Sequence, residues 1–339
     1  MTITTVVRRV LASAAAAAIA VAVLASAGPA VAKPSGLHST GSVKLGASVS
    51  SFTEAPDGVV YYSAGSSVYS VTGTSTPVLA VHAGGTVLAV AAGAKELFVA
   101  VGRTVTEYSR SNGAKGRQWK LGIQTKNKTT SAGLYAVGST VWGWTDWSTD
   151  ETGFEYATVS RFTTSSAAVH KVSSGIAYPA DMAANSAGLY YQAVKVNGTN
   201  GYLTRVTRSG SVRRVTDVNL DGPLALAGGR VEVLADHLRH GKVHLYIDSF
   251  EETTLAHVYS RPVSMADRDI AGTGDGLILI SASCQSFICS SAKVSRLSTA
   301  TGAVTATITV PDAFTALAGP SAAVLTYQGG NYSLVRLAG

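Results

Sequence analysis

The chain has 339 residues, of which 46% are hydrophobic and 14% are charged, and its formal net charge is +7 at pH 7. The Lys and Arg residues stand singly or in short groups, without a basic block or an RNA-binding motif, which argues against a nucleic-acid partner. Only two cysteines are present, which excludes a disulfide-dense scaffold.

The first 32 residues have the three parts of a secretory signal peptide. Arg8 and Arg9 precede an apolar run over Val10–Ala25, and small residues lead to a cleavage site after Ala32. The run is shorter than the roughly 20 residues that cross a bilayer core, which favours cleavage over an uncleaved membrane anchor. We therefore predict a protein secreted outside the cytoplasmic membrane, with no membrane span after cleavage.

A strand-and-turn unit recurs along the rest of the chain. In Gly58–Val81, runs rich in Val, Thr and Tyr alternate with Gly/Ser turns. The second strand of each unit returns at intervals of roughly forty residues, a period typical of propeller blades. Its markers are Val60, Leu97, Val141, Leu189, Val231, Leu277 and Val324. We predict an all-β fold, a β-propeller with seven blades of four antiparallel strands; six or eight blades remain as alternatives because the repeats are degenerate.

The two ends of the chain are expected to close the ring. After the short run FTALA the sequence supplies only two more strands, so the last blade lacks its outer strand. The run Ser42–Ser48 precedes the first complete blade and has no partner there. We expect it to complete the last blade, which removes exposed sheet edges. The predicted organisation is a signal peptide at 1–32, a flexible N-terminal segment at 33–41 and a monomeric propeller domain at 42–339.

Two segments carry a family resemblance. Val294–Val310, VSRLSTATGAVTATITV, resembles the outer half of a blade in bacterial YVTN-type and quinoprotein-like propellers, although Ser298 replaces the usual aspartate of the turn. Leu97–Leu121 is similar and places Trp119 like the tryptophan of quinoprotein blades. The resemblance implies a propeller fold, and the fold alone does not imply a function.

The cysteines stand close together, as Cys284 and Cys289. In an oxidising compartment, a pair across a short turn favours a disulfide over a metal site, which needs further ligands nearby. Two free thiols are the alternative.

One face of the propeller is expected to be elaborated. In blades 3 to 6, the segments between the second and third strands are long, whereas those of blades 1, 2 and 7 are short turns. These turns share a face with the links between blades. Loops on a rigid scaffold commonly carry function, so we predict the binding face here. Insertion drift in tolerant loops is the alternative.

The blade 3 insertion supplies the first candidate ligand contacts. Trp142 and Trp144 alternate within a strand and are expected in the core. Trp147 lies farther out, close to Asp146 and Asp150. An exposed indole beside carboxylates suits stacking on a sugar ring or a cationic group.

Aspartates also recur before or within the expected inner strands. Asp181, Asp221, Asp267 with Asp269, and Asp312 are the candidate acids at the channel mouth. Clustered carboxylates there would attract Ca²⁺ or a basic group. The alternative is that each aspartate orders its own turn through hydrogen bonds to the backbone.

No dedicated metal site and no cofactor are predicted, with Ca²⁺ as the open exception. His237, His240 and His244 have zinc-like spacing only on a helix, and Gly241 interrupts the segment, which favours a solvated loop.

The sequence lacks a nucleophile elbow, an H-E-x-x-H motif, a Walker loop and a dinucleotide fingerprint. We therefore expect a secreted non-enzymatic binding or scaffold protein that holds an extracellular protein, peptide or glycan. The alternative is a polysaccharide hydrolase or lyase with carboxylates near the channel mouth.

Overall fold

The computed structural model describes the backbone of residues 36–122, 131–148, 155–194, 201–218, 222–240, 242–273, 276–285 and 288–339. All regular elements among these residues are β-strands. None of them is a helix of the length and hydropathy needed to cross a membrane. The predicted signal peptide lies outside the described residues.

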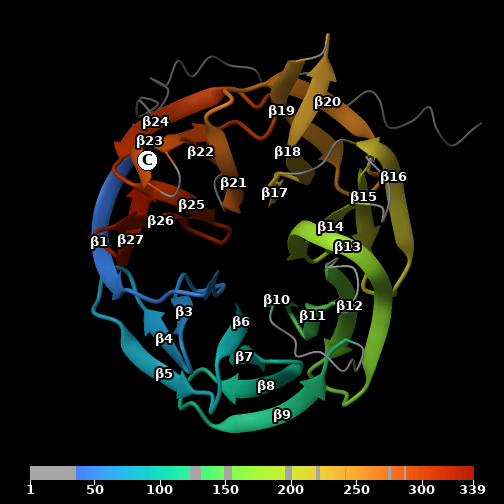
Figure 1. The fold of residues 1–339 in the computed structure, drawn as a ribbon. Coiled ribbons are helices and arrows are strands. Elements are labelled where there is room, and N and C mark those ends of the chain that lie inside the picture. The colour runs from blue at the N-terminus through green and yellow to red at the C-terminus, as the bar shows by residue number, and fades with distance from the viewer. Residues whose placement is uncertain are drawn as a thin grey trace, which may run out of the picture. The chain divides into compact units, whose positions relative to one another are not determined.

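The strands form blades around a common centre (Figure 1). Blade 1 contains β2 (Ser51–Glu54), β3 (Val60–Ala64), β4 (Ser67–Val71) and β5 (Val78–His82). Blade 2 contains β6 (Val87–Ala92), β7 (Glu96–Val101), β8 (Thr104–Ser109) and β9 (Lys115–Lys120). Blade 3 contains β10 (Ala132–Val137), β11 (Thr140–Ser148), β12 (Glu155–Thr163) and the first part of β13 (Val169–Asn185).

The remaining blades follow in the same order. Blade 4 contains the second part of β13 with β14 (Gly188–Val194), β15 (Gly201–Val206) and β16 (Val212–Val218). Blade 5 contains β17 (Leu224–Ala227), β18 (Arg230–Arg239), β19 (Lys242–Glu251) and β20 (His257–Pro262). Blade 6 contains β21 (Asp267–Thr273), β22 (Gly276–Gln285), β23 (Ile288–Leu297) and β24 (Val304–Val310). Blade 7 contains β25 (Ala313–Leu317), β26 (Ala322–Gln328), β27 (Asn331–Ala338) and β1 (His38–Gly46).

One long strand serves two blades. The first part of β13 pairs with β12, and from Ala177 onward the strand pairs with β14. It is therefore the outer strand of blade 3 and the inner strand of blade 4, and blades 3 and 4 form one seven-stranded sheet. With β13 counted in both, the strands make seven blades of four, as predicted.

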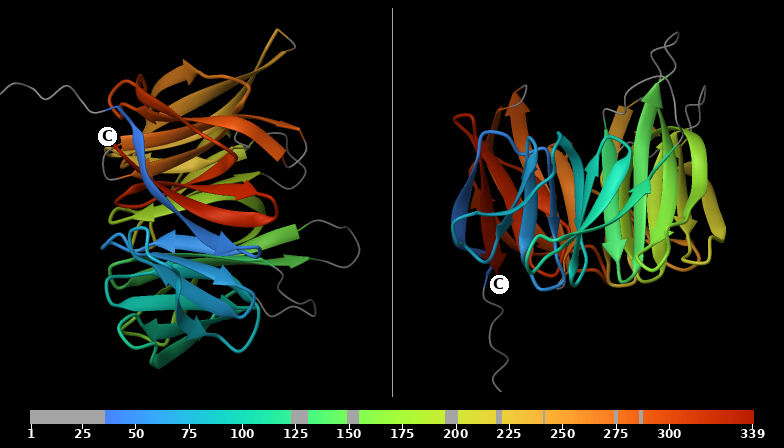
Figure 2. Two further views of the ribbon diagram at one scale, coloured as in Figure 1. Left: turned by 90° about the vertical axis from the view of Figure 1, so that its left-hand side faces the viewer. Right: turned by 90° about the horizontal axis from the view of Figure 1, so that it is seen from below.

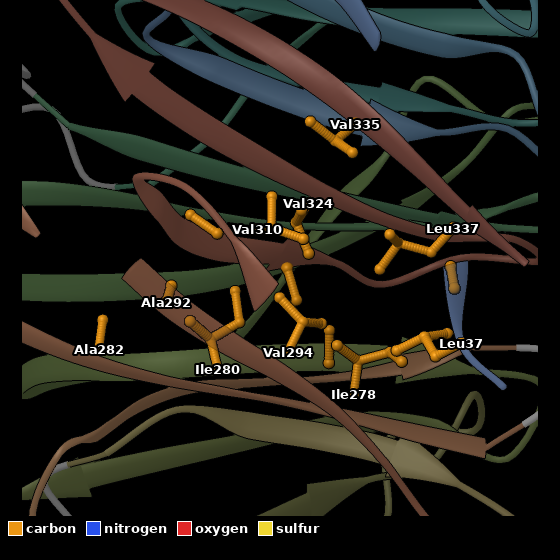
Figure 3. Packing of buried hydrophobic residues seen from close by; sticks show 14 residues of the cluster. Leu37, Ile278, Ile280, Ala282, Ala292, Val294, Val310, Val324, Val335 and Leu337 are labelled. Carbon is orange, nitrogen blue, oxygen red and sulfur yellow. The ribbon is translucent and has the colours of Figure 1, made fainter. Parts of the chain in front are cut away.

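The hydrophobic core is divided by blade. The described residues form seven buried clusters, and each cluster fills one interface between neighbouring blades. Figure 3 shows the cluster between blades 6 and 7, where Ile280 and Val294 meet Val324 and Leu337. A blade exposes an apolar surface on both faces, so it is stable only between two neighbours. This periodic burial explains the repeat seen in the sequence. All seven marker residues lie in second strands and are buried.

The N-terminal strand closes the ring, as predicted. β1 pairs antiparallel with β27, so blade 7 combines both ends of the described chain. The strand begins at His38, earlier than the expected boundary at Ser42, because His38 and Ser39 already pair with Ala338 and Leu337.

The connections alternate between two faces. In blades 1, 2 and 7, two-residue turns such as Gly65–Ser66 join the second and third strands. In blades 3, 5 and 6 these strands are 9 or 10 residues long. Figure 2 shows the β11–β12 hairpin, in green, rising on one face, with the C-terminus on the other. We call the side of the raised hairpins and the links between blades the long-hairpin face.

The raised segments correct one expectation. The stretches predicted as long loops in blades 5 and 6 are largely paired strand, because the β18–β19 ladder continues to Arg239 and Lys242 and the β22–β23 ladder to Gln285 and Ile288. Hydrogen-bonded ladders hold these hairpins in a defined shape. The blade 4 connection, residues 195–200, lies outside the described residues.

The backbone register brings the two cysteines opposite one another. Cys284 in β22 pairs directly with Cys289 in β23. Cα atoms of directly opposed antiparallel residues are about 4.5 to 5.5 Å apart, within the range that a disulfide spans. Their side chains lie outside what the structure describes, so the disulfide stays a prediction.

We expect the cysteines to be linked in the exported protein. Intact-mass measurement under non-reducing conditions should then show no alkylated thiol, and two after reduction. Because the enclosed loop is short, reduction should lower the free energy of unfolding by only about 2 kcal/mol. Alkylation of both thiols in the unreduced protein would contradict the pairing.

Candidate functional site

The described residues line a central channel. Its volume is about 890 Å³, and its wall comes from the inner strands of all seven blades. The channel stays open because many wall residues are Ala or Gly. Two of these glycines are also required by close packing: a Cβ on Gly222 would lie 2.0 Å from the Leu234 carbonyl oxygen, and one on Gly272 1.9 Å from that of Leu226.

Blades 3 and 4 give the channel an apolar wall. Tyr135 of β10, Trp144 of β11 and Met182 of β13 line it together. The indole of Trp144 packs over Gly133, where an added Cβ would lie 2.1 Å from Nε1. Trp142, by contrast, does not line the channel and is completely buried in the interface between blades 3 and 4. The core expectation thus holds for Trp142, while Trp144 also reaches the channel.

The charged groups of the channel wall all have one sign. Glu54, Glu252 and Asp269 are its carboxylates, and the described part of the wall contains no Lys, Arg or His. This contrasts with the basic character of the whole chain. A low-dielectric channel lined by one sign of charge concentrates counter-ions of the opposite sign.

Two of the three carboxylates are already engaged by the protein. The Glu54 side chain is fully buried, and its Oε1 lies 2.7 Å from Nη1 of Arg336 on blade 7. Arg336 also donates to the carbonyl oxygen of Gly58, 2.8 Å away. Glu252 accepts a hydrogen bond of 2.8 Å from Asn185 Nδ2 across the interface of blades 4 and 5. These carboxylates hold blades together.

Asp269 differs from the other two. It lies near the start of β21, toward the long-hairpin face, and its Oδ2 accepts bonds from Thr315 Oγ1 at 2.6 Å and from the Ala316 amide at 2.8 Å. Both side-chain bonds therefore end on one oxygen. Removal from bulk water raises the pKa of Asp269 to about 6, against the lowering effect of these two donors.

The predicted contacts of blade 3 lie at the long-hairpin face. Trp147 pairs with Tyr156 near the far end of β11, and its side chain lies outside the described part of the structure. Asp146 is buried, with Oδ1 accepting a hydrogen bond of 2.9 Å from the Ser131 amide just before β10. Asp150 lies outside the described residues. The role of these three in binding stays a prediction.

The predicted channel-mouth acids have different surroundings. Asp181 falls in an irregular stretch of β13, where two residues oppose one on β14, and only its backbone is described. Asp221 lies outside the described residues. Asp267 is buried. It accepts a hydrogen bond of 2.8 Å from the Ser264 amide in its own turn and another from the Ser281 hydroxyl on β22. Burial raises the pKa of Asp267. This geometry matches the turn-ordering alternative for Asp267.

The histidine segment is a hairpin, which corrects the expected loop. His237 and His244 are directly opposed in β18 and β19, and His240 occupies the turn with a φ of 50°. His237 Nε2 lies 2.7 Å from Oδ2 of the buried Asp248. Among the described residues, no group of three or more His, Cys, Asp or Glu side chains is arranged to hold a metal ion.

Sequence reasoning missed the channel wall itself. Asp269 was grouped with Asp267, and Tyr135, Glu54 and Glu252 were not singled out. The available signal was the run of small residues in some of the inner strands, such as AVAA in β6 and ALA in β17. Small side chains at a propeller axis leave room for a ligand, and the bulky or acidic exceptions then mark the wall.

No protein-family profile and no curated protein sequence matches this chain. Solved β-propellers resemble it in structure. The WD40 propeller domain of Doa1 has a TM-score of 0.56 at 12% identity, covering 90% of this chain and 97% of that one. A chain of the mitotic checkpoint complex has a TM-score of 0.59 at 12% identity, covering 88% and 94%. PorZ, a surface component of the type-IX secretion system of Porphyromonas gingivalis, has a TM-score of 0.52 at 12% identity, covering 88% of this chain and 39% of that one. At such identity the likeness shows the fold.

Proposed function

We propose that this chain is a secreted, non-enzymatic binding protein that uses the long-hairpin face of a seven-bladed propeller to hold an extracellular protein, peptide or glycan. The single observation that carries the proposal is the asymmetry of the two faces. Second and third strands are prolonged in blades 3, 5 and 6 on the face where the links between blades also lie. We also propose that, among β-propellers, this chain is related to the bacterial YVTN-type and quinoprotein-like group.

The prolonged strands support binding in physical terms. Ladder residues beyond the core, such as those of β18 and β19 up to Arg239 and Lys242, bury little apolar surface against a neighbouring blade. A hairpin that adds little to the core still has to be ordered on folding, at a cost in conformational entropy. A rigid hairpin beside a cavity presents contacts with less entropy left to lose on binding.

The neighbours in structure agree with a binding role. Two of them are named from assemblies, the mitotic checkpoint complex and a bacterial secretion system. The hydrolase or lyase alternative has less support, because Glu54, Glu252 and Asp269 come from three separate blades and each has its own protein partner. In glycosidases, by contrast, two carboxyl groups flank one bond.

The test begins with export. The full chain is expressed in a bacterium, recovered from outside the cytoplasmic membrane and applied to arrays of extracellular proteins, peptides and glycans. Specific capture of a ligand class that is blocked by an insertion in the β18–β19 turn supports the proposal. Retention in the cytoplasm, or turnover of an arrayed polysaccharide, would overturn it.

Trp147 gives the array a point variant. Replacing Trp147 by Ala should weaken binding of the captured ligand by about 1 to 3 kcal/mol, as for an exposed aromatic anchor, and should leave thermal unfolding nearly unchanged. Titration of the ligand into both proteins measures the difference.

Trp119 is the matched control for this variant. It is 2% exposed and stacks on Phe162 of blade 3 with ring centroids 4.4 Å apart. Replacing Trp119 by Ala should cost about 3 to 5 kcal/mol of stability. If the Trp147 variant unfolds in the same way, Trp147 belongs to the core and the assignment of this contact is wrong.

A further inference from the structure

We propose that the channel receives the basic side chain of a partner polypeptide, lysine or arginine, which enters from the long-hairpin face and pairs with Asp269. The inference rests on the proposed binding function and names the chemistry of its ligand. It depends on three features of the channel: an oxygen left for a ligand, an apolar wall across the ring and wall carboxylates that are too far dispersed over separate blades to suit a metal ion.

The first feature is the geometry of the Asp269 carboxylate. Thr315 and Ala316 of β25 fix Oδ2 through two bonds, so the orientation of the carboxylate does not depend on a ligand. Among the described side chains none donates to Oδ1, and the residue lines the channel. A fixed carboxylate that presents one oxygen to a cavity is prepared for a charge-assisted hydrogen bond from an ammonium or guanidinium group.

The second feature is the wall across the ring. Figure 1 places β10 and β21 on opposite sides of the centre. Tyr135 and Trp144 of blade 3 line the channel together with Asp269 of β21. Lys and Arg carry long aliphatic stems that pack on apolar surface while the charged head remains at a polar group. The volume of about 890 Å³ accommodates such a side chain with part of its backbone.

The third feature is the dispersed position of the wall carboxylates, which favours a basic side chain over a metal ion. Ca²⁺ binds six to eight oxygens at once. The described wall offers three carboxylates from separate blades, two of them engaged by Arg336 and Asn185. A single monovalent organic cation needs only one carboxylate, which is what Asp269 provides.

Uncharged hydrogen-bond donors, together with burial, set the pKa of Asp269. The groups that act on its pKa from neighbouring strands are the Thr315 hydroxyl and the Ala316 amide, with the Ile270 amide on its own strand. The nearest ionisable side chains along β21 are Asp267, bonded within its own turn, and the exposed Arg268. Since burial raises the pKa of Asp269 to about 6, the carboxylate is ionised at pH 7.5 and mostly protonated at pH 5.

The test uses the exported protein and a labelled Gly-Gly-Lys-Gly-Gly peptide followed by fluorescence anisotropy. The same peptide with norleucine in place of lysine measures the apolar contribution. We expect the lysine peptide to bind more tightly, and Asp269→Asn to weaken it by about tenfold or more while leaving the norleucine peptide unchanged. Binding of the lysine peptide to the unaltered protein should also rise by about tenfold between pH 5 and pH 7.5, as the carboxylate ionises.

Glu252→Gln is the matched control, because it removes the same charge at the opposite end of the same channel. It should change lysine-peptide binding by less than about threefold. Equal losses in both variants would mean that net charge alone attracts the peptide, and would overturn the proposal. Equal binding of the lysine and norleucine peptides, or displacement of the peptide by Ca²⁺ at millimolar concentration, would overturn it as well.

The pH profile of the unaltered protein serves if Asp269→Asn fails to fold, and a flat profile counts against the proposal. Failure here is distinct from failure of the binding function. An array ligand that depends on Trp147, together with no preference for lysine over norleucine, would retain the function and reject the basic side chain.

Discussion

Replacing Glu54 by Gln is expected to lower the free energy of unfolding by about 3 to 5 kcal/mol. Glu54 of blade 1 and Arg336 of blade 7 form an ion pair of 2.7 Å at the seam where the ring closes, and the Glu54 side chain is fully buried. The glutamine variant leaves the Arg336 guanidinium buried without a counter-charge, which costs more than the loss of the attraction itself. Urea unfolding monitored by tryptophan fluorescence measures the change.

The matched control is Asp57→Asn. Asp57 pairs with Arg110 at the same distance of 2.7 Å, but its side chain is 56% exposed. Solvent screens such a pair, so the loss should be at most about 1 kcal/mol. Adding Arg336→Met to Glu54→Gln should restore part of the stability, because the unpaired charge is removed. Equal losses for Glu54→Gln and Asp57→Asn would show that the seam is not specially dependent on its ion pair.

Replacing Glu232 by Gln is expected to stabilise the protein at pH 8 by up to about 3 kcal/mol and to change little at pH 4.5. Glu232 is completely buried in blade 5, where Ser249 Oγ donates to it at 3.0 Å and Tyr259 OH at 3.2 Å. Burial raises its pKa from 4.5 to about 7, against the lowering effect of these hydroxyls and of Arg230. The folded protein therefore keeps a proton on Glu232 that the unfolded chain has already released.

The sign of the pH dependence follows from this difference. Between pH 4.5 and pH 7 the folded state binds more protons than the unfolded state, so the free energy of unfolding falls as the pH rises. The glutamine of the Glu232→Gln variant is neutral at every pH, so the contribution of position 232 to this fall in the free energy of unfolding disappears. Asp269 contributes in the same direction, so the quantity to compare is the difference between variant and unaltered protein across the pH range.

The exposed Glu251, at the end of β19 in the same hairpin, supplies the control. Glu251→Gln removes the same charge from an exposed side chain and so measures the effect of net charge on the unfolding curves. A Glu232→Gln protein with the same slope as the unaltered protein would mean that Glu232 is ionised when folded.

The propeller was predictable because its physical cause is periodic. Val60, Leu97 and the later markers recur because each second strand is buried between two blades, and a strand alternates sides at every residue. The closing role of the N-terminal strand followed from counting, since the last blade had one strand too few and Ser42–Ser48 had no partner. Both inferences used local pattern and the requirement that no sheet edge remain open.

The raised hairpins were only partly predictable. Their positions followed from the unequal lengths of the repeats. That they continue as paired strands did not, because His237, His240 and Gly241 read as turn chemistry, whereas the pairing of His237 with His244 depends on the register set farther down the ladder.

Tertiary structure alone decided that Asp267 bonds to its own blade while Asp269 lines the channel. Both aspartates were expected at the channel mouth, because both stand before or within an expected inner strand. The β21–β22 pairing shifts register between them, and Asp267 turns to Ser264 and Ser281 while Asp269 reaches Thr315 on the next blade. The sequence by itself favoured seven blades, the closure of the ring and the face that is elaborated, because these depend on periodic burial. Which carboxylate reaches the channel depends on a single bulge and on contacts between separate blades, which no local pattern encodes.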